Sequence, residues 1–234
     1  MNNEIYDNRL KQIFNVKSLN NVIFEQERIA KVISTKKVFD TNQTYGIPSA
    51  EALYFNIAKS RSEDIPRYKQ RILNERHKGL IQDSKVFDYF EILIESIVFS
   101  VMCVETFCNH SIPDDFYHEE NRLINSSNIW VAINKKNIER NISLEVKLHA
   151  ILPKVFKCNS PKGLNQWKQF KEMIKLRNDL VHFKTNSGIH LHKIQDSIWD
   201  RLLDFKYSPS TVALELIKCY YKSNDLPKWI QKTA

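Results

Sequence analysis

The sequence contains few of the residues that interrupt regular structure. Its 234 residues include only 4 glycines and 7 prolines, too few for the many turns of a β-sandwich. Hydrophobic residues make up 42% of the chain, which is enough to form a buried core. We therefore expect an all-α fold built from long helices.

A hydrophobic run long enough to cross a membrane is also missing. The most apolar stretch, residues 92–107, contains Glu95 and Glu105, so it predicts a buried helix. The chain does not begin with a charged segment followed by an apolar one, and this indicates that there is no signal peptide. We expect a cytoplasmic protein with no membrane partner.

Common metal and cofactor motifs are absent. The four cysteines include no Cys-x-x-Cys pair, and His190 and His192 have no anchored third ligand. There is no Walker loop, dinucleotide fingerprint, Gly-x-Ser-x-Gly elbow or His-Glu-x-x-His motif, which argues against nucleotide hydrolysis, redox, esterase and zinc-protease chemistry. We expect reduced structural thiols, no metal and no cofactor.

Basic residues exceed acidic ones. Lys and Arg number 35 against 27 acids, giving a formal net charge of +8, and this balance favours polyanionic partners. Part of the excess lies between Lys59 and Lys78, where a helix could follow a phosphate backbone. The commoner alternative for such a charge run is a solvated helix face.

The chain divides into an amino-terminal elaboration, residues 1–80, and a helical domain, residues 81–234. Residues 1–47 show no clean hydrophobic period, and we expect mixed or irregular helix there. Ser49 predicts the start of a short helix over 50–59, and Pro66 is suited to the first turn of another. In the second part we expect helices at 83–109, 143–156, 165–184 and 211–222, and loops at 121–128 and 160–163.

Arg177 is a charged residue at a position where the helical pattern predicts an apolar one. On a helical wheel of residues 167–184, the apolar side chains gather on one side, and Arg177 falls in the middle of them. A guanidinium cannot lose its proton and is costly to bury unpaired. Arg177 therefore needs a carboxylate, the equivalent residue of a second copy, or a bound anion.

Asn178 and His182 share one side of the same helix. They are four residues apart and lie at the edge of the apolar side, whereas Arg177 and His182 are separated by about 140° on an ideal helix. Arg177 and His182 can reach one ligand only from a rim. A cleft between helices or across a dimer axis would suit them.

The arrangement of Arg177, Asn178 and His182 near a helix end resembles the signature of the HEPN (higher eukaryotes and prokaryotes nucleotide-binding) superfamily. In that signature an Arg, often followed directly by a polar residue, precedes a His by four to six positions. The long helix 83–109, with its polar end at residues 104–109, resembles the helix that precedes the motif. The resemblance covers roughly residues 83–225 and leaves the first 80 unexplained.

The resemblance implies an antiparallel helical bundle that forms a homodimer, with Arg177 and His182 of both copies facing across the axis. Catalytic members of the superfamily cleave RNA without a metal. Many are toxins or antiviral-defence effectors, which implies an antitoxin or defence-system partner. Members without nuclease activity also exist, so the motif alone does not establish catalysis.

Each motif residue suits one part of RNA cleavage. His182 can act as base or acid near neutral pH, and Arg177 can hold the phosphate and stabilise its developing charge. Asn178 would orient the phosphate or His182. Only one His of each chain lies in the motif, so a second proton-transfer group would come from the dimer mate or from water. DNA lacks the required 2′-hydroxyl.

Glu105 and Asn109 are candidate supporting residues at the end of the long helix. Glu105 projects from an apolar side and could pair with Arg177 or position His182. The alternative for Glu105 is a structural ion pair that holds two helices together, and Asn109 leaves the same two possibilities open.

Three functions therefore remain open. The leading hypothesis is a dimeric, metal-independent endoribonuclease that leaves 2′,3′-cyclic phosphate ends. The alternative is a non-catalytic module that binds RNA or a protein partner through the same cleft. The third hypothesis is a dimerisation scaffold in which Arg177 pairs with Glu105 and nothing else binds.

Overall fold

The computed structural model is mostly helical over the residues that it describes. Strands there occur only as two-stranded antiparallel pairs. The expected helical class is confirmed at this coarse level. The described residues are 12–13, 30–31, 33–38, 41–75, 82–124, 127–182, 197–221 and 226–231.

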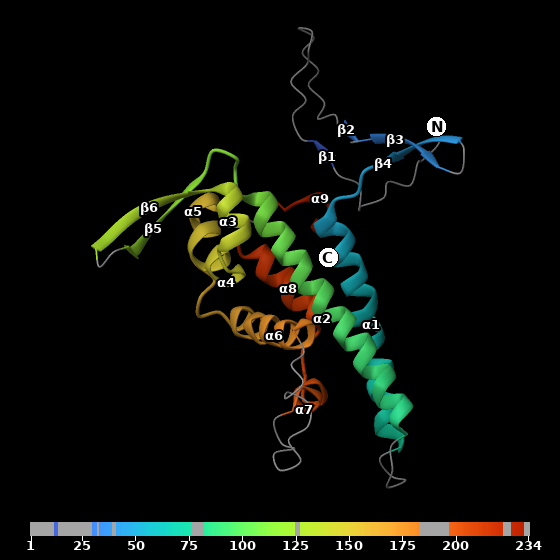
Figure 1. The fold of residues 1–234 in the computed structure, drawn as a ribbon. Helices are drawn as coiled ribbons and strands as arrows, with labels where there is room; N and C mark the ends of the chain where they lie inside the picture. Colours follow the sequence, from blue (N-terminus) through green and yellow to red (C-terminus); the bar gives the residue numbers. More distant parts are fainter. Residues whose placement is uncertain are drawn as a thin grey trace.

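Two long antiparallel helices form the centre of the fold (Figure 1). Helix α1 runs over Ala50–Glu75 and packs along α2, which runs over Asp83–Ser111. The predicted helix 83–109 is confirmed and extends two residues further. The apolar residues of α2 point in most directions because α1, α6 and α8 all pack against it. Among the described helices, none combines the length and hydrophobicity needed to cross a bilayer.

Helix α1 is longer than the sequence predicted. We expected a helix over 50–59 and another from Pro66, but a single helix continues through Pro66. Pro66 is exposed and removes one backbone hydrogen bond, and the packing of Ile65, Tyr68 and Ile72 against the core outweighs that loss. Helix α1, which falls within residues 1–80, therefore shares one hydrophobic core with α2.

The described parts of residues 1–47 are strands, so the prediction of helix there was wrong. These strands are β1 (Gln12–Ile13), β2 (Ala30–Lys31), β3 (Ile33–Val38) and β4 (Thr41–Gly46). The register of β3 and β4 runs from the pair Ile33 and Gly46 to the pair Val38 and Thr41. Both strands are rich in β-branched residues, whose stiff side chains favour extended backbone.

A second correction concerns residues 121–128, where we expected a loop: the described ones, 121–124 and 127–128, belong to the two strands of a β-hairpin. Strand β5 (Tyr117–Ile124) pairs with β6 (Ser127–Asn134), and the hairpin projects from the helices (Figure 1). Its inner face buries His118 and Ile133, while Trp130 on the outer face is exposed. The Asn and Ser residues suggested a loop, but the run of apolar residues at 129–133 in β6 outweighs them.

The predicted helix 143–156 is confirmed as one helical stretch with an unexpected centre. After α3 (Lys135–Asn141), it consists of α4 (Leu144–Val146), the π-helix η2 (Lys147–Ile151) and α5 (Leu152–Phe156). Ser143 caps it, since its Oγ accepts a hydrogen bond from the amide of Val146 at 3.3 Å. The wider π turn precedes Pro153, which cannot donate a backbone hydrogen bond.

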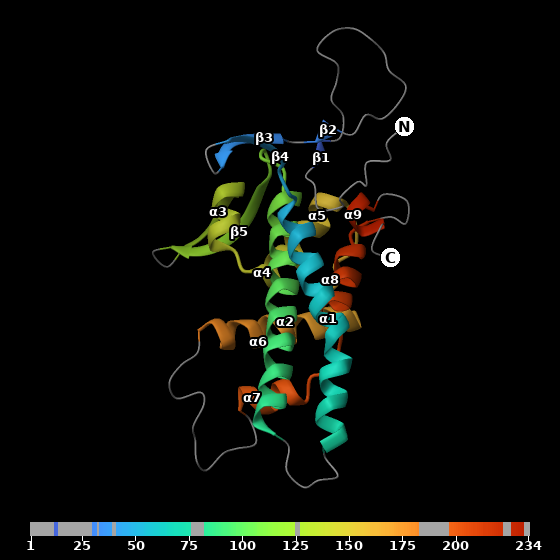
Figure 2. The same cartoon turned by 90° about the vertical axis from the view of Figure 1, so that its right-hand side faces the viewer.

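Helix α6 (Asn165–Val181) crosses α2 instead of running along it, as Figures 1 and 2 show. Its Phe170, Met173 and Leu176 are fully buried against the core. The predicted helix 165–184 is thus confirmed as far as residue 181, with His182 as the C-cap, and residues 183 and 184 lie outside the described residues.

Three more helices complete the described chain. The predicted helix 211–222 corresponds to α8, and the loop at 160–163 is confirmed. Helix α7 had no counterpart in the predictions, and a capping box of Ser197 and Asp200 begins it. The bounds are α7 (Ile198–Leu203), α8 (Pro209–Lys218) and α9 (Lys228–Gln231).

Candidate functional site

Arg177 lies on the side of α6 that faces the core, as its position in the sequence predicted. One Nη atom lies 3.1 Å from a carboxylate oxygen of Glu105 on α2, and this ion pair joins the two helices. The side chains are 21% and 41% exposed, so the pair sits at the edge of the core. The expected carboxylate partner of Arg177 is therefore Glu105, one of the candidates from the sequence.

The guanidinium of Arg177 is not fully satisfied by this pair. Its Nε is buried and has no hydrogen-bond partner among the described residues. A buried donor without an acceptor costs about 1–3 kcal/mol. An acceptor that reached this N–H would recover that free energy, so Arg177 retains a capacity to bind an anion in addition to Glu105.

Asn178 and His182 are exposed, whereas Arg177 faces inward. The backbone N–H of His182 donates to the Asn178 carbonyl at 3.0 Å, which closes the last turn of α6. Within the described part of the chain, the His182 imidazole makes no hydrogen bond or ion pair. Of the three motif residues, Arg177 is therefore held by the core, whereas Asn178 and His182 face outward.

Asn109 contacts a residue that the sequence analysis missed, Lys147. Lys147 is 1% exposed, and its ammonium donates to the Asn109 side-chain oxygen and to the Glu139 carbonyl, each at 2.9 Å. Burial lowers the pKa of Lys147, and the nearby carboxylates of Glu105 and Glu139 oppose that shift. Lys147 is the first residue of η2.

The sequence pattern around Lys147 could have identified it as a buried cation. Leu144, Leu148 and Ile151 are buried on one side of the predicted helix 143–156, and Lys147 falls among them. A cation on an apolar side is the pattern that identified Arg177. The two cations approach the end of α2 from different helices, and the group Glu105, Asn109, Lys147 and Arg177 is called the polar cluster below.

The polar cluster fixes the orientation of its members. Glu105 pairs with Arg177 directly and interacts electrostatically with Lys147, while Asn109 is held by the Lys147 ammonium. The ion pair with Glu105 keeps the guanidinium in one position. The cluster can therefore present Arg177 in a defined geometry.

An open pocket of about 620 Å³ lies on the outward side of α6 and reaches Asn178. Two ion pairs border it: Lys171 with Glu145 at 3.3 Å, and Arg201 with Asp179 at 2.6 Å. Its remaining lining residues are Glu172, Ile174 and Lys175. This pocket, unlike Arg177, is open to solvent.

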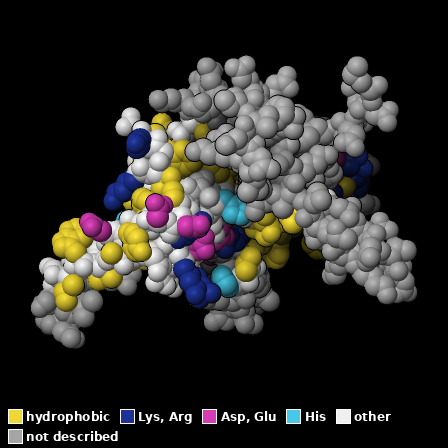
Figure 3. Space-filling model, turned by 90° about the horizontal axis from the view of Figure 1, so that it is seen from above, with side chains coloured by type: hydrophobic (Ala, Val, Ile, Leu, Met, Phe, Trp, Pro, Cys, Tyr) yellow, Lys and Arg dark blue, Asp and Glu magenta, His cyan; other side chains and the backbone are white. Residues whose placement is uncertain are grey.

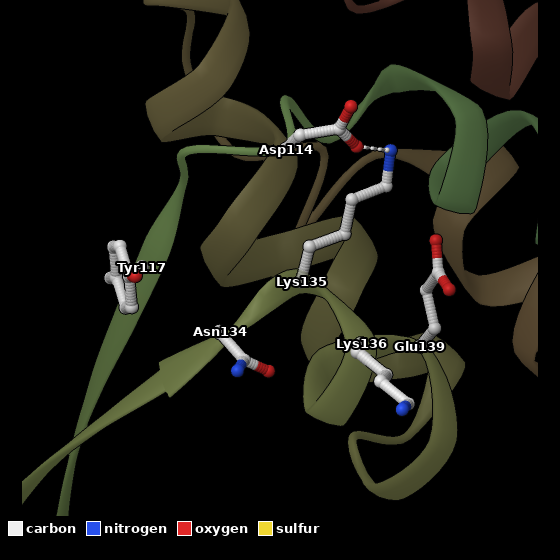
Figure 4. Close-up of a pocket in the computed structure, with 6 residues that line it drawn as sticks. All are labelled: Asp114, Tyr117, Asn134, Lys135, Lys136 and Glu139. Atoms are coloured by element: carbon white, nitrogen blue, oxygen red, sulfur yellow. Dashed lines mark hydrogen bonds and ion pairs between the residues drawn. The ribbon is translucent and has the colours of Figure 1, made fainter.

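A second open pocket, of about 480 Å³, contains none of the predicted residues. It lies at the base of the β5–β6 hairpin, where the Lys135 ammonium donates to Asp114 at 2.8 Å (Figure 4). Seen from above, acidic and basic side chains are interspersed on the described surface (Figure 3). That surface shows no large area of one charge.

The positive run between Lys59 and Lys78 is partly compensated by ion pairs where it is described. Arg61 pairs with Glu95 of α2 at 2.5 Å, and Arg67 pairs with Asp64 at 3.3 Å. The geometry supports the interpretation as a solvated helix face.

No metal site is found in the segments that the structure describes. There, no group of three or more His, Cys, Asp or Glu side chains is placed to hold an ion. His190 and His192 lie outside the described residues. The cysteines are free, and Cys103 and Cys108 are buried in α2.

The buried thiols predict that the fold is lost in alkaline solution. Burial raises the pKa of Cys103 and Cys108 above the usual value of 9.0. Unfolded thiols ionise above that pH while folded thiols stay protonated. The contribution of the two thiols to the free energy of unfolding is therefore fully present below about pH 9 and is lost as the pH rises further. We expect a loss of about 1.4 kcal/mol for each thiol and pH unit.

Thermal unfolding followed between about pH 8 and pH 11 checks this expectation. The double variant Cys103→Ala/Cys108→Ala should lose less stability over the same range. An equal loss in both proteins would show that other groups cause it, and Tyr220 and Tyr221, whose pKa values burial also raises, are the next candidates.

In the arrangement as a whole, the core holds Arg177 through Glu105, buries Lys147 against Asn109, and leaves Asn178 and His182 open to solvent. These features suit anion binding by Arg177 and proton transfer by His182. Comparison with known proteins gives no assignment, since no family model, no curated protein and no solved structure matches the chain.

Proposed function

We propose that this chain is a metal-independent endoribonuclease of the HEPN type, with Arg177 and His182 as its catalytic residues. One observation carries the proposal: a guanidinium fixed by Glu105 keeps an unsatisfied N–H, and a solvent-exposed His182 follows at the end of the same helix. A fixed cation and a free imidazole are the groups that phosphodiester cleavage requires.

The reaction is an attack of a ribose 2′-hydroxyl oxygen on the adjacent phosphorus. His182 takes the hydroxyl proton as the O–P bond forms. Arg177, whose guanidinium reaches the same phosphate from the rim of the cleft or across the dimer axis, stabilises the negative charge of the phosphorane. The bond from phosphorus to the 5′-oxygen then breaks, and that oxygen receives a proton. The products are a 2′,3′-cyclic phosphate and a 5′-hydroxyl.

The other residues of the site assist this reaction. Asn178, exposed one turn before His182, orients the phosphate or the imidazole. Glu105 and the Lys147–Asn109 contact hold Arg177 in position. Each chain supplies one motif His, so the second proton-transfer group comes from a second copy of the chain or from water.

The biological role belongs to the same proposal. The resemblance of Arg177, Asn178 and His182 to the HEPN signature favours a homodimeric toxin or antiviral-defence effector that an antitoxin or a defence-system partner controls. The RNA-cleaving activity is the part of the proposal that can be measured directly.

The direct test is to incubate the purified protein with total RNA in EDTA. We expect cleavage to fragments with 2′,3′-cyclic phosphate ends, because no metal takes part. An oligoribonucleotide with one 2′-deoxy sugar at the cleaved position is the matched control, and it should stay intact since it lacks the nucleophile.

Two results would contradict the proposal. Cleavage of the 2′-deoxy control would exclude attack by the 2′-hydroxyl. RNA that stays intact but binds with salt-dependent affinity would identify a non-catalytic RNA-binding module instead.

A further inference from the structure

We infer that the outward side of α6 is the binding track for the RNA strand. In this inference, which rests on the proposed function, Lys168, Lys171 and Lys175 bind phosphates next to the scissile one. The open pocket beside Asn178 then takes the flanking nucleotide. These three residues are called the lysine stripe below.

The spacing of the lysine stripe places it in line with the proposed proton-transfer residue. Lys168, Lys171, Lys175, Asn178 and His182 follow one another at intervals of three or four residues, so they share one side of the helix. All five side chains are exposed, in contrast to the buried opposite side of α6. The stripe therefore leads along the helix directly to His182.

The length of this track suits a short single strand. Each helical residue advances the chain by about 1.5 Å, so Lys171 and His182 are separated by roughly 16 Å along the axis. A strand lying on this surface would place several consecutive phosphates within reach of the lysines. The phosphate at His182 would be the one that is cleaved.

The charges around the lysine stripe leave it positive. Neither Lys168 nor Lys175 forms an ion pair with any described residue. Lys171 pairs with Glu145, and Arg201 compensates Asp179, so Glu172 is the remaining acid on this surface. The Lys171 pair is half-exposed and weak, so a phosphate can replace Glu145 at little cost.

The pocket is large enough for a nucleotide. Its volume of about 620 Å³ falls within the usual range for small-ligand pockets, and its lining is mostly charged and polar. Lys171 and Lys175 line the pocket and are placed to bind a phosphate. Asn178 adds an amide that can donate to the base or the sugar.

The experiment measures binding separately from cleavage. The probe is a labelled 2′-O-methyl oligoribonucleotide, which has no free 2′-hydroxyl and so cannot be cleaved. We expect Lys171→Ala/Lys175→Ala to weaken binding roughly 10-fold at low salt and to reduce the salt slope by about 1.4, since each single-strand phosphate contact contributes about 0.7. Fluorescence anisotropy over a series of salt concentrations gives both quantities.

The matched control is Lys69→Ala/Lys136→Ala, which removes the same charge from exposed positions on α1 and α3. Thermal unfolding of both variants checks that each still folds. An equal loss of affinity in the two variants, or an unchanged salt slope in the first, would overturn the binding track. Stronger competition by polyglutamate than by RNA would replace RNA with an acidic protein partner.

The two proposals fail in distinguishable ways. If the stripe variant loses oligonucleotide affinity but the wild type leaves total RNA intact in EDTA, the binding track stands and the ribonuclease proposal falls. If the wild type cleaves RNA and the stripe variant binds and cleaves as well as it does, the ribonuclease proposal stands and the binding track falls.

Discussion

The His182→Ala variant should cleave RNA roughly 10²- to 10⁴-fold more slowly than the wild type, the usual contribution of a general acid or base. His182 is exposed at the end of α6 and supports no part of the core, so the variant should fold normally. Single-turnover cleavage of a labelled oligoribonucleotide in EDTA measures the rate. Thermal unfolding confirms that the fold is intact.

The matched control is His110→Ala. His110 is also exposed near a helix end, and its ring Nδ1 lies 2.8 Å from a carboxylate oxygen of Glu51. Removing such a pair costs at most about 1 kcal/mol of stability and should leave cleavage unchanged. Equal rates for wild type and His182→Ala would show that the imidazole takes no part in the reaction.

Arg177 requires a conservative substitution, because Arg177→Ala would leave Glu105 without its partner. Arg177→Lys keeps the positive charge but loses the planar, multiple-donor geometry. We propose that Arg177 stabilises the transition state, and the loss of one such donor lowers the cleavage rate roughly 10²-fold. A reduced cleavage rate with unchanged oligonucleotide affinity would distinguish that role from simple substrate binding.

The Lys147→Ala variant should lose about 2–4 kcal/mol of stability. The substitution leaves the Asn109 side-chain oxygen and the Glu139 carbonyl without their donor, and each unsatisfied acceptor costs about 1–3 kcal/mol. The lost aliphatic stem adds a cavity, and relief from burying an ammonium offsets part of the total. Thermal unfolding should show a midpoint lower by roughly 10 °C.

Two companion variants separate these contributions. Lys147→Met keeps the buried stem and removes only the donors, so it should be less destabilised than Lys147→Ala. Lys136→Ala removes an exposed lysine and should change stability by less than about 0.5 kcal/mol. If Lys147→Ala were as stable as the wild type, the ammonium would not hold the polar cluster together.

The helices that build the site could be predicted because their patterns are long and consistent. Helix α2 has apolar residues around most of its circumference, and α6 separates apolar from charged residues over its whole length. The pairing of Arg177 with Glu105 followed from one physical requirement, that a guanidinium on an apolar side needs a carboxylate or an anion.

Other elements were missed because tertiary contacts override short local patterns. Helix α1 continues through Pro66 because packing along α2 compensates for one lost hydrogen bond. The β5–β6 hairpin contains Asn and Ser residues typical of loops, but cross-strand pairing stabilises it. Lys147 was overlooked although it lies on an apolar side of its helix, as Arg177 does, and the structure adds the acceptors that satisfy its buried ammonium.

The exposed position of His182 also differs from the expectation. Asn178 and His182 were placed at the edge of the apolar side, but both belong with the lysines on the solvent side. A helical wheel gives the direction of each side chain about the helix axis, and it does not show how far the neighbouring helices extend. Near the end of α6 the core no longer covers the helix, and Val181 is exposed as well.

Where α6 crosses α2, one side of the helix packs in the core and the other side faces solvent, so substitutions on the two sides have different consequences. Substitutions at Phe170, Met173 or Leu176 should lower the amount of folded protein, whereas under the proposed function those at Lys171, Lys175 or His182 should change RNA binding or cleavage. Under the same proposal Arg177 should affect both stability and cleavage, since it pairs with Glu105. Residues on the outward side of α6 can therefore change during evolution to suit a new substrate while the packing of the core stays the same.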